Sequence, residues 1–162
     1  MSEPTATTAV PQPGEPAPEF TLPDGEGNSV SLAALRGQTV VLYFYPRDDT
    51  PGCTAEACGF RDAWAELRER GVMVLGISRD TVKSHQKFAR KYALPFTLLA
   101  DEGGAVAQRY GVWIQKSMYG RQYMSTARTT FLIRPDGKVG HVWQQVKPEG
   151  HAQKVLEYVA KN

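Results

Sequence analysis

The sequence predicts an α/β protein of three layers, with a central mixed β-sheet between layers of helices. Short β-branched and aromatic runs, VVLYFY at 40–45 and VMVLGIS at 72–78, alternate with longer amphipathic segments. The chain then closes with a β-hairpin and a last helix, which adds antiparallel strands to parallel ones. With 162 residues, it is long enough for one domain with a hydrophobic core.

The N-terminal elements are predicted in this order. Residues 1–18 are rich in Pro, Thr, Ala and Glu and predict a flexible tail, so that the single domain spans residues 19–162. The run FTLPDGEGNSVSL predicts a small β-hairpin around residues 24–28. After the strand at 40–45, a helix should run from Pro51 to Arg70 and end at Gly71.

The C-terminal half predicts further alternation of strands and helices. The expected elements are a strand at 72–78, a helix at 81–92 capped by Thr81 or Asp80, a strand at 96–101, a short helix at 104–110, a hairpin at 129–143 and a helix at 151–160. The polar and aromatic connection at 114–127 is expected to be mobile or to border the active site. This order suits a thioredoxin-like fold with an N-terminal β-hairpin extension.

Composition and charge exclude several classes of function. The formal net charge is +2, from 19 Lys and Arg against 17 Asp and Glu, and no basic block indicates a nucleic-acid surface. No apolar run approaches the ~18 residues of a membrane span. The start MSEPTATTAVPQPGEPAP lacks the basic and apolar regions of a secretion signal, so we expect a cytoplasmic protein. In that compartment a cysteine pair is more often catalytic or metal-binding than structural.

Both cysteines of the chain lie in the stretch PRDDTPGCTAEAC, at 46–58. Thr50 predicts a helix N-cap, and Pro51 fits the first helical position, where a missing N–H group costs nothing. Cys53 then occupies the third helical position. Free backbone N–H groups and the helix dipole favour a thiolate there, so Cys53 is the better nucleophile on local grounds.

Cys58 is expected to lie on another face of the same helix. A five-residue offset places two Cα atoms of a helix about 8.7 Å apart, whereas a disulfide rarely spans more than about 7 Å. A bond between Cys53 and Cys58 therefore requires the first helical turns to unwind. The apolar face that should pack on the sheet is formed by Cys53, Ala57, Phe60, Trp64 and Leu67, and the wet face by Cys58, Arg61, Asp62 and Glu69.

Other interpretations of these residues remain open at this point. The two cysteines could be inert. A metal site is less favoured, because two thiolates supply half of a tetrahedral shell and the three histidines are scattered along the chain. Asp48 and Asp49 could raise the pKa of the nearby thiol, but the favoured expectation is that they are solvated loop residues or cap partners. Glu56 could pair with an arginine or simply complement the helix dipole.

The segment YFYPRDDTPGCTAEACGFRD closely resembles the peroxiredoxins. Pro46, Thr50 and Cys53 form the family signature P-x-x-x-T-x-x-C, and the C-x4-C pair is similar to the Q type, also called bacterioferritin comigratory protein. Further similar blocks follow in order over nearly the whole ordered chain: PAPEFTLPDGEG, VLGIS, YALPFTLLAD, YGVW and RTTFLIRPDGKVGHVW.

The resemblance implies a role for each matching residue. Cys53 would be the peroxidatic cysteine and Cys58 the resolving cysteine, with an intramolecular disulfide between them. Pro46 would shield the thiolate, Thr50 would hydrogen-bond it and the peroxide, and Arg128 would stabilise the thiolate and polarise the peroxide. No cofactor is implied.

The resemblance also implies the partners and leaves alternatives to test. The substrates would be hydrogen peroxide and organic hydroperoxides, and the reductant thioredoxin or a glutaredoxin-like protein. A monomer is expected, with a dimer as the alternative. Two competing functions are a protein disulfide oxidoreductase, which the lack of a C-x-x-C motif disfavours, and a redox sensor that uses the same helix.

Overall fold

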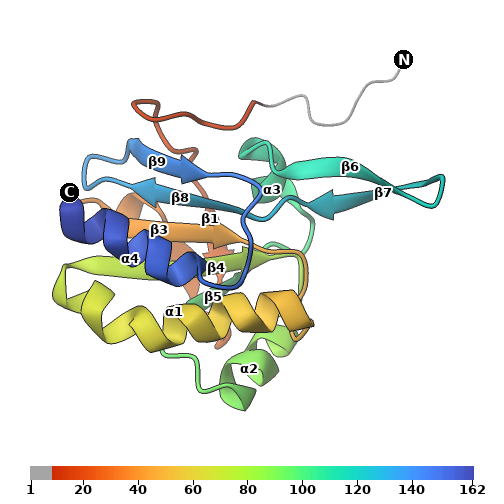
Figure 1. Ribbon diagram of the computed structural model, residues 1–162, viewed down its shortest axis with the longest axis horizontal. Helices are drawn as coiled ribbons and strands as arrows, with labels where there is room; N and C mark the ends of the chain where they lie inside the picture. Colours follow the sequence, from red (N-terminus) through yellow and green to blue (C-terminus); the bar gives the residue numbers. More distant parts are fainter. Residues whose placement is uncertain (1–8) are drawn as a thin grey trace.

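A five-stranded mixed β-sheet forms the centre of the protein (Figure 1). The computed structural model describes residues 9–162. The strand order is β5-β4-β3-β8-β9. The parallel strands are β3 (Thr39–Phe44), β4 (Val72–Ser78) and β5 (Thr97–Ala100), and antiparallel pairing joins β3 to β8 (Thr129–Ile133) and β8 to β9 (Val139–Trp143). This confirms the predicted mixed sheet.

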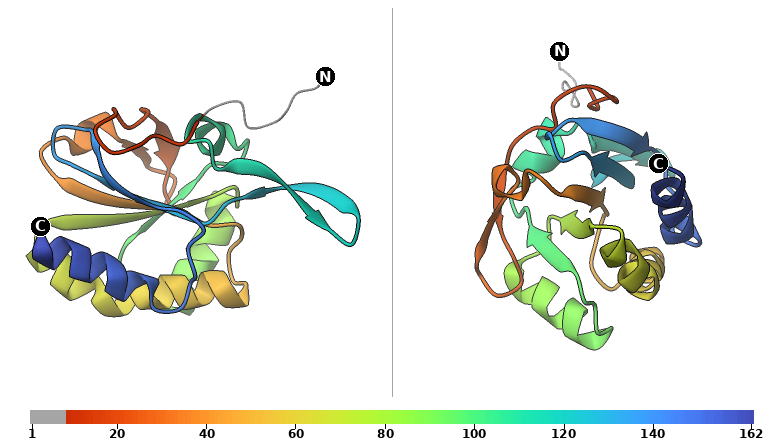
Figure 2. Two further views of the ribbon diagram at one scale, coloured as in Figure 1. Left: turned by 45° about the horizontal axis from the view of Figure 1, so that its top comes forward. Right: turned by 90° about the vertical axis from the view of Figure 1, so that its left-hand side faces the viewer.

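Helices cover both faces of the sheet (Figure 2). On one face, α1 (Pro51–Glu69), α2 (Val82–Lys91) and α4 (His151–Lys161) share one apolar cluster. On the other face, α3 (Ala105–Arg109) and the N-terminal segment, with the short 3₁₀ helix η1 (Ala33–Leu35), share a second cluster. The predicted thioredoxin-like arrangement of three layers is confirmed.

Strand β3 explains why the run VVLYFY lacks hydrophobic alternation. Val41 and Tyr43 belong to the cluster under α1, while Leu42 and Phe44 belong to the cluster under α3. Both faces of the strand are therefore buried, as central parallel strands require. The chain leaves β3 through the loop at 45–50 and enters α1, so the carboxyl end of a rigid central strand places the start of α1.

The predicted N-terminal hairpin is present. Strands β1 (Thr21–Pro23) and β2 (Ser29–Ser31) pair antiparallel. The carboxylate of Asp24 accepts hydrogen bonds from the backbone N–H groups of Glu26 and Asn28, both at 2.9 Å, which closes the turn.

Part of the segment expected to be a flexible tail is packed against the sheet. Gly14 N–H donates to the Val139 carbonyl at 2.8 Å, and Ala17 N–H donates to the Gly137 carbonyl at 3.0 Å. Ala17 is also buried in the apolar cluster under α3. These hydrogen bonds and this burial offset the conformational entropy that the segment loses when it is ordered. The polar composition of the segment does not reveal these contacts. Residues 1–8, the rest of the expected tail, lie outside the described residues.

The connection at 114–127 is a β-hairpin rather than a mobile loop. Strands β6 (Trp113–Met118) and β7 (Arg121–Thr126) pair antiparallel and form an arm that projects from the body (Figures 1 and 2). Its turn residues Tyr119 and Gly120 have φ angles of 53° and 78°. Two successive positive φ angles match the twist of a tight hairpin, but a tyrosine at the first position gives little sequence signal for such a turn.

Candidate active site

Helix α1 starts as the sequence predicts, with Thr50 in extended conformation at the N-cap and Pro51 at the first position. Cys53 is therefore in the first turn, and its side chain is buried against the sheet. The Thr50 side chain differs from expectation, because its hydroxyl donates to the Arg47 carbonyl at 3.0 Å and makes no capping bond. The hydroxyl therefore does not occupy the first-turn N–H groups, whose partial positive charge favours an anion there.

Arg128 lies beside the start of α1, although it is 75 residues away from Cys53 in the sequence. Thr129, the first residue of β8, pairs with Phe44 at the end of β3. Arg128 therefore lies just beyond the edge where the loop to α1 begins. Its Nη2 atom donates to Cys53 Sγ at 3.4 Å. At this distance the guanidinium can hydrogen-bond the sulfur directly, and a charged donor of this kind suits a nucleophilic sulfur.

The same guanidinium holds a buried carboxylate. Arg128 Nη1 donates to Glu56 Oε1 at 2.7 Å, and the Glu56 side chain is fully buried. Burial raises the pKa of Glu56 to about 7, against the lowering effect of Arg128. Of the two roles that the sequence left open for Glu56, the structure shows pairing with an arginine.

Arg128 therefore lies between two groups that can carry a negative charge, the Glu56 carboxyl group and the Cys53 thiol. Burial alone would lower the pKa of Arg128, but the charges of Glu56 and Cys53 outweigh burial and raise it. The second carboxylate oxygen of Glu56 has no hydrogen-bond partner among the described residues. An unpaired buried oxygen favours the protonated carboxyl group.

The backbone around the site is closely packed. A Cβ atom at Gly52 would lie 3.2 Å from Arg128 Nη2 and 3.3 Å from the Pro148 ring. Glycine at this position thus lets the loop before α4 approach the start of α1. The same loop holds the Arg128 backbone, because Val146 N–H donates to the Arg128 carbonyl at 3.0 Å.

His151, at the start of α4, also lies in this region. Its Nε2 atom is 2.8 Å from Thr130 Oγ1. Burial, together with the charges of Lys154 and Arg128, lowers the pKa of His151 to about 4, so its imidazole is neutral at pH 7.

Cys58 lies farther along the same unbroken helix and is partly exposed. Both thiols are free. In a regular helix their Cα atoms are about 8.7 Å apart, beyond the reach of a disulfide. The structure thus shows the helical, reduced arrangement that the spacing predicts.

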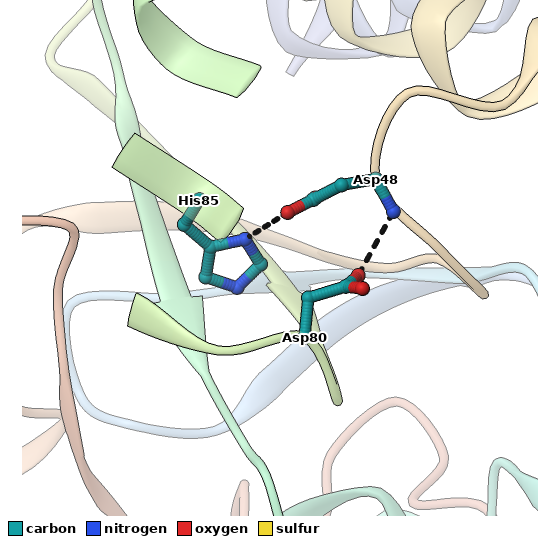
Figure 3. A group of neighbouring side chains, drawn as sticks. All are labelled: Asp48, Asp80 and His85. Atoms are coloured by element: carbon teal, nitrogen blue, oxygen red, sulfur yellow. Dashed lines mark hydrogen bonds and ion pairs between the residues drawn. The ribbon is translucent and has the colours of Figure 1, made fainter. Parts of the chain in front are cut away.

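Asp48 is the largest departure from the sequence analysis. Instead of being solvated, it lies buried between the loop and α2 (Figure 3). Its carboxylate accepts from the Tyr45 hydroxyl at 2.6 Å and from the Ser84 hydroxyl at 2.7 Å, and it lies 2.7 Å from His85 Nδ1. The sequence carries a signal for this contact, since a buried tyrosine hydroxyl requires a partner and Asp48 follows Tyr45 by three residues.

Asp49, the next residue, lies on the solvent side of α2. It accepts from Lys91 Nζ and from the Tyr92 hydroxyl, both at 2.8 Å. The hydrogen bonds from Lys91 and then Tyr92 lower the pKa of Asp49. It is exposed, as expected, but it is tied to α2.

A metal could be held in principle by Asp48, Asp80 and His85, whose candidate ligand atoms lie within 4.8 Å of one another. Both nitrogens of His85 are already engaged, however, by Asp48 at 2.7 Å and by the Leu99 carbonyl at 2.9 Å. The backbone N–H of Asp48 donates to Asp80 Oδ2 at 2.8 Å. Hydrogen bonds within the group therefore account for its geometry without a metal.

Four of the five predicted site residues, Pro46, Thr50, Cys53 and Arg128, gather around the start of α1. Pro46 is half-buried in the loop, two residues after the end of β3. No hydrogen bond joins the Thr50 hydroxyl to Cys53 within residues 9–162. The fifth, Cys58, is held apart by the helix. The arrangement can support a buried thiolate beside a fixed guanidinium, with a second thiol nearby that needs a conformational change to reach it.

Comparison with known proteins gives a consistent result. The protein-family model described as the AhpC/TSA family matches residues 13–142. A protein of Coxiella burnetii named putative peroxiredoxin bcp is 54% identical over 143 residues, which cover 88% of this chain and 95% of that protein. The peroxiredoxin Bcp of Escherichia coli K12 is 46% identical over 149 residues, covering 92% of this chain and 96% of that protein.

A solved structure shares the whole fold. The structure of the Xanthomonas campestris bacterioferritin comigratory protein, described as giving insights into its alkyl peroxide reduction activity, superposes with a TM-score of 0.86. The two chains are 36% identical, with 97% of this chain and 98% of that chain covered.

Proposed function

Because the chain belongs to the AhpC/TSA family and is a peroxiredoxin, a thiol peroxidase, we propose that Cys53 is its peroxidatic cysteine and Cys58 its resolving cysteine. One observation carries this proposal. The Cys53 sulfur is buried in the first turn of α1 and lies 3.4 Å from a guanidinium nitrogen of Arg128. Near Cys58, the Arg61 guanidinium bonds instead to Asp62 and the Tyr92 carbonyl, and no hydrogen bond to the Cys58 sulfur is found within residues 9–162.

In the first step, the Cys53 thiolate attacks the terminal oxygen of the peroxide. A sulfur–oxygen bond forms, the oxygen–oxygen bond breaks, and Cys53 becomes a sulfenic acid. The leaving oxygen departs as hydroxide or alkoxide and takes a proton to become water or an alcohol. Arg128 and the first-turn N–H groups are preorganised donors for the developing negative charge.

Thr50 and Pro46 have supporting roles in this step. The Thr50 hydroxyl gives its hydrogen to the Arg47 carbonyl, so its oxygen lone pairs remain available to accept a hydrogen bond from the peroxide. Pro46 has no backbone N–H group and shields the site from water without requiring a hydrogen-bond partner of its own.

In the second step, the Cys58 sulfur attacks the Cys53 sulfenic acid. A disulfide forms and the sulfenic oxygen leaves as water. Since the intact helix holds the two Cα atoms about 8.7 Å apart, the residues between them must unwind before the bond can form. Each turnover is therefore coupled to local unfolding of α1.

In the third step, a thiol reductant restores both cysteines by thiol–disulfide exchange. We propose thioredoxin or a glutaredoxin-like protein for this role, and both hydrogen peroxide and organic hydroperoxides as substrates. The alkyl peroxide reduction activity named for the Xanthomonas campestris relative supports the second substrate class.

We further propose a monomer acting in the cytoplasm, where reduced dithiols are available. The formal charge of +2 offers no strong attraction for nucleic acid. Within the described part of the chain, every helix is too short or too polar to cross a membrane.

The test is to mix the reduced protein with one equivalent of hydrogen peroxide and to follow its free thiols over time. Both thiols should disappear within seconds, far faster than those of free cysteine. Cys53→Ser should abolish the reaction. Cys58→Ser should react once and stop at a sulfenic acid that a dimedone-type reagent traps. A wild-type rate equal to that of free cysteine would refute the peroxidase assignment, and sustained thioredoxin-dependent turnover by Cys58→Ser would refute the role of Cys58.

A further inference from the structure

We infer that Asp48 and Asp49 anchor the loop before α1 to helix α2, position Cys53 for the peroxide and set the upstream limit of unwinding when the disulfide forms. The inference rests on the proposed roles of Cys53 and Cys58. We call the contacts of Asp48 the inner anchor and those of Asp49 the outer anchor. They make both aspartates positioning residues, since neither touches the reacting sulfur.

The inner anchor is a buried contact between Asp48 and His85 (Figure 3). His85 Nε2 faces the Leu99 carbonyl, which can only accept, so this nitrogen carries a hydrogen. His85 Nδ1 faces Asp48 Oδ2, which also accepts from the Ser84 hydroxyl. Asp48 thus contacts two residues in the first turn of α2 through one carboxylate oxygen.

The remaining contacts of the inner anchor tie the loop to the sheet as well. Tyr45, the residue after β3, donates its hydroxyl to Asp48 Oδ1 at 2.6 Å. Burial and the charge of Asp48 raise the pKa of Tyr45 well above its ordinary value, which keeps this donor neutral. The backbone N–H of Asp48 donates to Asp80, just after β4, at 2.8 Å.

The outer anchor lies at the opposite end of α2. Asp49 has a φ angle of 56°, a left-handed conformation in which a short polar side chain is tolerated. Asp49 bonds to Lys91 and Tyr92 at the end of α2, whereas Asp48 bonds to Ser84 and His85 near its start. The loop is thus fixed to both ends of a helix that does not unwind in the proposed reaction.

These anchors end one residue before the N-cap Thr50. The chain from Asp49 to Cys53 is four residues long and spans at most about 14 Å when extended. Even after α1 unwinds, an anchored loop would keep Cys53 within that distance of Asp49 and help it return to Arg128. Without the anchors, Cys53 would lose alignment in the reduced state, while unwinding and disulfide formation would be no slower.

Measuring Cys53 oxidation and disulfide formation separately therefore distinguishes the effect of the anchors from a general destabilisation of the fold. Rapid mixing with peroxide, followed by alkylation and mass analysis, gives the rate of Cys53 oxidation and the rate of disulfide formation. Asp48→Ala should slow the first step by about 10- to 100-fold, as expected for a displaced nucleophile, and leave the second unchanged or faster. Asp48→Asn should stay close to wild type, since its amide can donate to a neutral His85 while its oxygen accepts from Tyr45.

Variants of the outer anchor provide a second test, which does not depend on the buried network around Asp48. The double variant Lys91→Met with Tyr92→Phe should slow the first step by up to about fivefold, the effect expected of exposed contacts. Lys87→Met is the matched control, because Lys87 is exposed on the same helix and makes no side-chain hydrogen bond within residues 9–162. It should react like wild type. If Asp48→Ala does not fold, the double variant decides the question.

Amide exchange tests the limit of unwinding in the wild-type protein. With the disulfide formed by diamide, residues 51–58 should exchange faster than in the reduced protein, while the Asp48 amide keeps its protection. Three results would overturn the inference. They are loss of exchange protection at the Asp48 amide in the oxidised protein, a rate of Cys53 oxidation in the folded anchor variants equal to that of wild type, and an equal slowing of Cys53 oxidation and disulfide formation. A wild-type Cys53 as slow as free cysteine would instead refute the proposed function, and the diamide experiment would still decide on the anchors.

Discussion

The carboxyl group of Glu56 should make the stability of the reduced protein fall as pH rises. Burial raises the pKa of Glu56 from its ordinary value of 4.5 to about 7. The folded protein therefore prefers the protonated carboxyl group, and its stabilising effect is complete below pH 4.5 and lost as pH rises to 7. At about 1.4 kcal/mol for each pH unit, the loss over this interval is about 3 kcal/mol.

The perturbation that isolates this effect is Glu56→Gln. Glutamine keeps an oxygen that can accept from Arg128 Nη1 but does not titrate. Urea unfolding of both reduced proteins at pH 4.5, 5.5, 6.5 and 7.5 gives their free energies of unfolding. The value for wild type minus that for Glu56→Gln should fall by up to about 3 kcal/mol across the series. A difference that is the same at every pH would refute the reasoning.

A control separates the buried carboxyl group from charge removal in general. Glu66 lies exposed on the same helix, so Glu66→Gln removes a similar charge without burial. Its difference from wild type should vary far less over the same pH range. A pH dependence as large as that of Glu56→Gln would show that burial of Glu56 is not the cause.

Three further predictions concern other parts of the structure. Arg128→Met should slow the reaction of Cys53 with peroxide by about 100-fold, as loss of a preorganised donor does, in stopped-flow kinetics; a rate within twofold of wild type would contradict its role. Burial lowers the pKa of His151 to about 4, so its neutral imidazole stabilises the fold less as pH falls below 6.5. In urea unfolding, the free energy of unfolding of wild type minus that of His151→Gln should therefore be smaller at pH 5 than at pH 7.5; an equal difference at both pH values would exclude this cause. A Cβ atom at Gly76 would lie 2.8 Å from Leu98 Cδ2, so Gly76→Ala should destabilise the fold by about 1–3 kcal/mol. Gly103→Ala, where a Cβ atom meets nothing within 4 Å, should leave the Tm nearly unchanged.

Much of the fold could be predicted because local signals agreed with tertiary packing. The buried runs became β3 and β4, and Thr50 and Pro51 marked the start of α1. The hairpin of β6 and β7 was missed because its turn uses a tyrosine with positive φ. The packing of residues 9–18 was missed because their hydrogen bonds go to β9 and the turn before it, over a hundred residues away.

The sequence indicated the role of some site residues and not of others. Cys53 was found from helix capping, a local effect of three neighbouring residues. Arg128 required the family resemblance, because its contact with Cys53 spans 75 residues and arises from the pairing of β3 with β8. Asp48 was misjudged because charged residues in loops are usually solvated, and only the folded structure brings His85 to it.

The central claim is that Cys53 and Cys58 form their disulfide only after the start of α1 unwinds. The most direct test is amide hydrogen exchange over residues 51–62, compared between the reduced protein and the protein oxidised by one equivalent of hydrogen peroxide. The account predicts slow exchange in the reduced helix and much faster exchange in the oxidised form, with lower far-UV helicity. Equal protection in the two forms, in a protein whose disulfide is verified by mass, would contradict it.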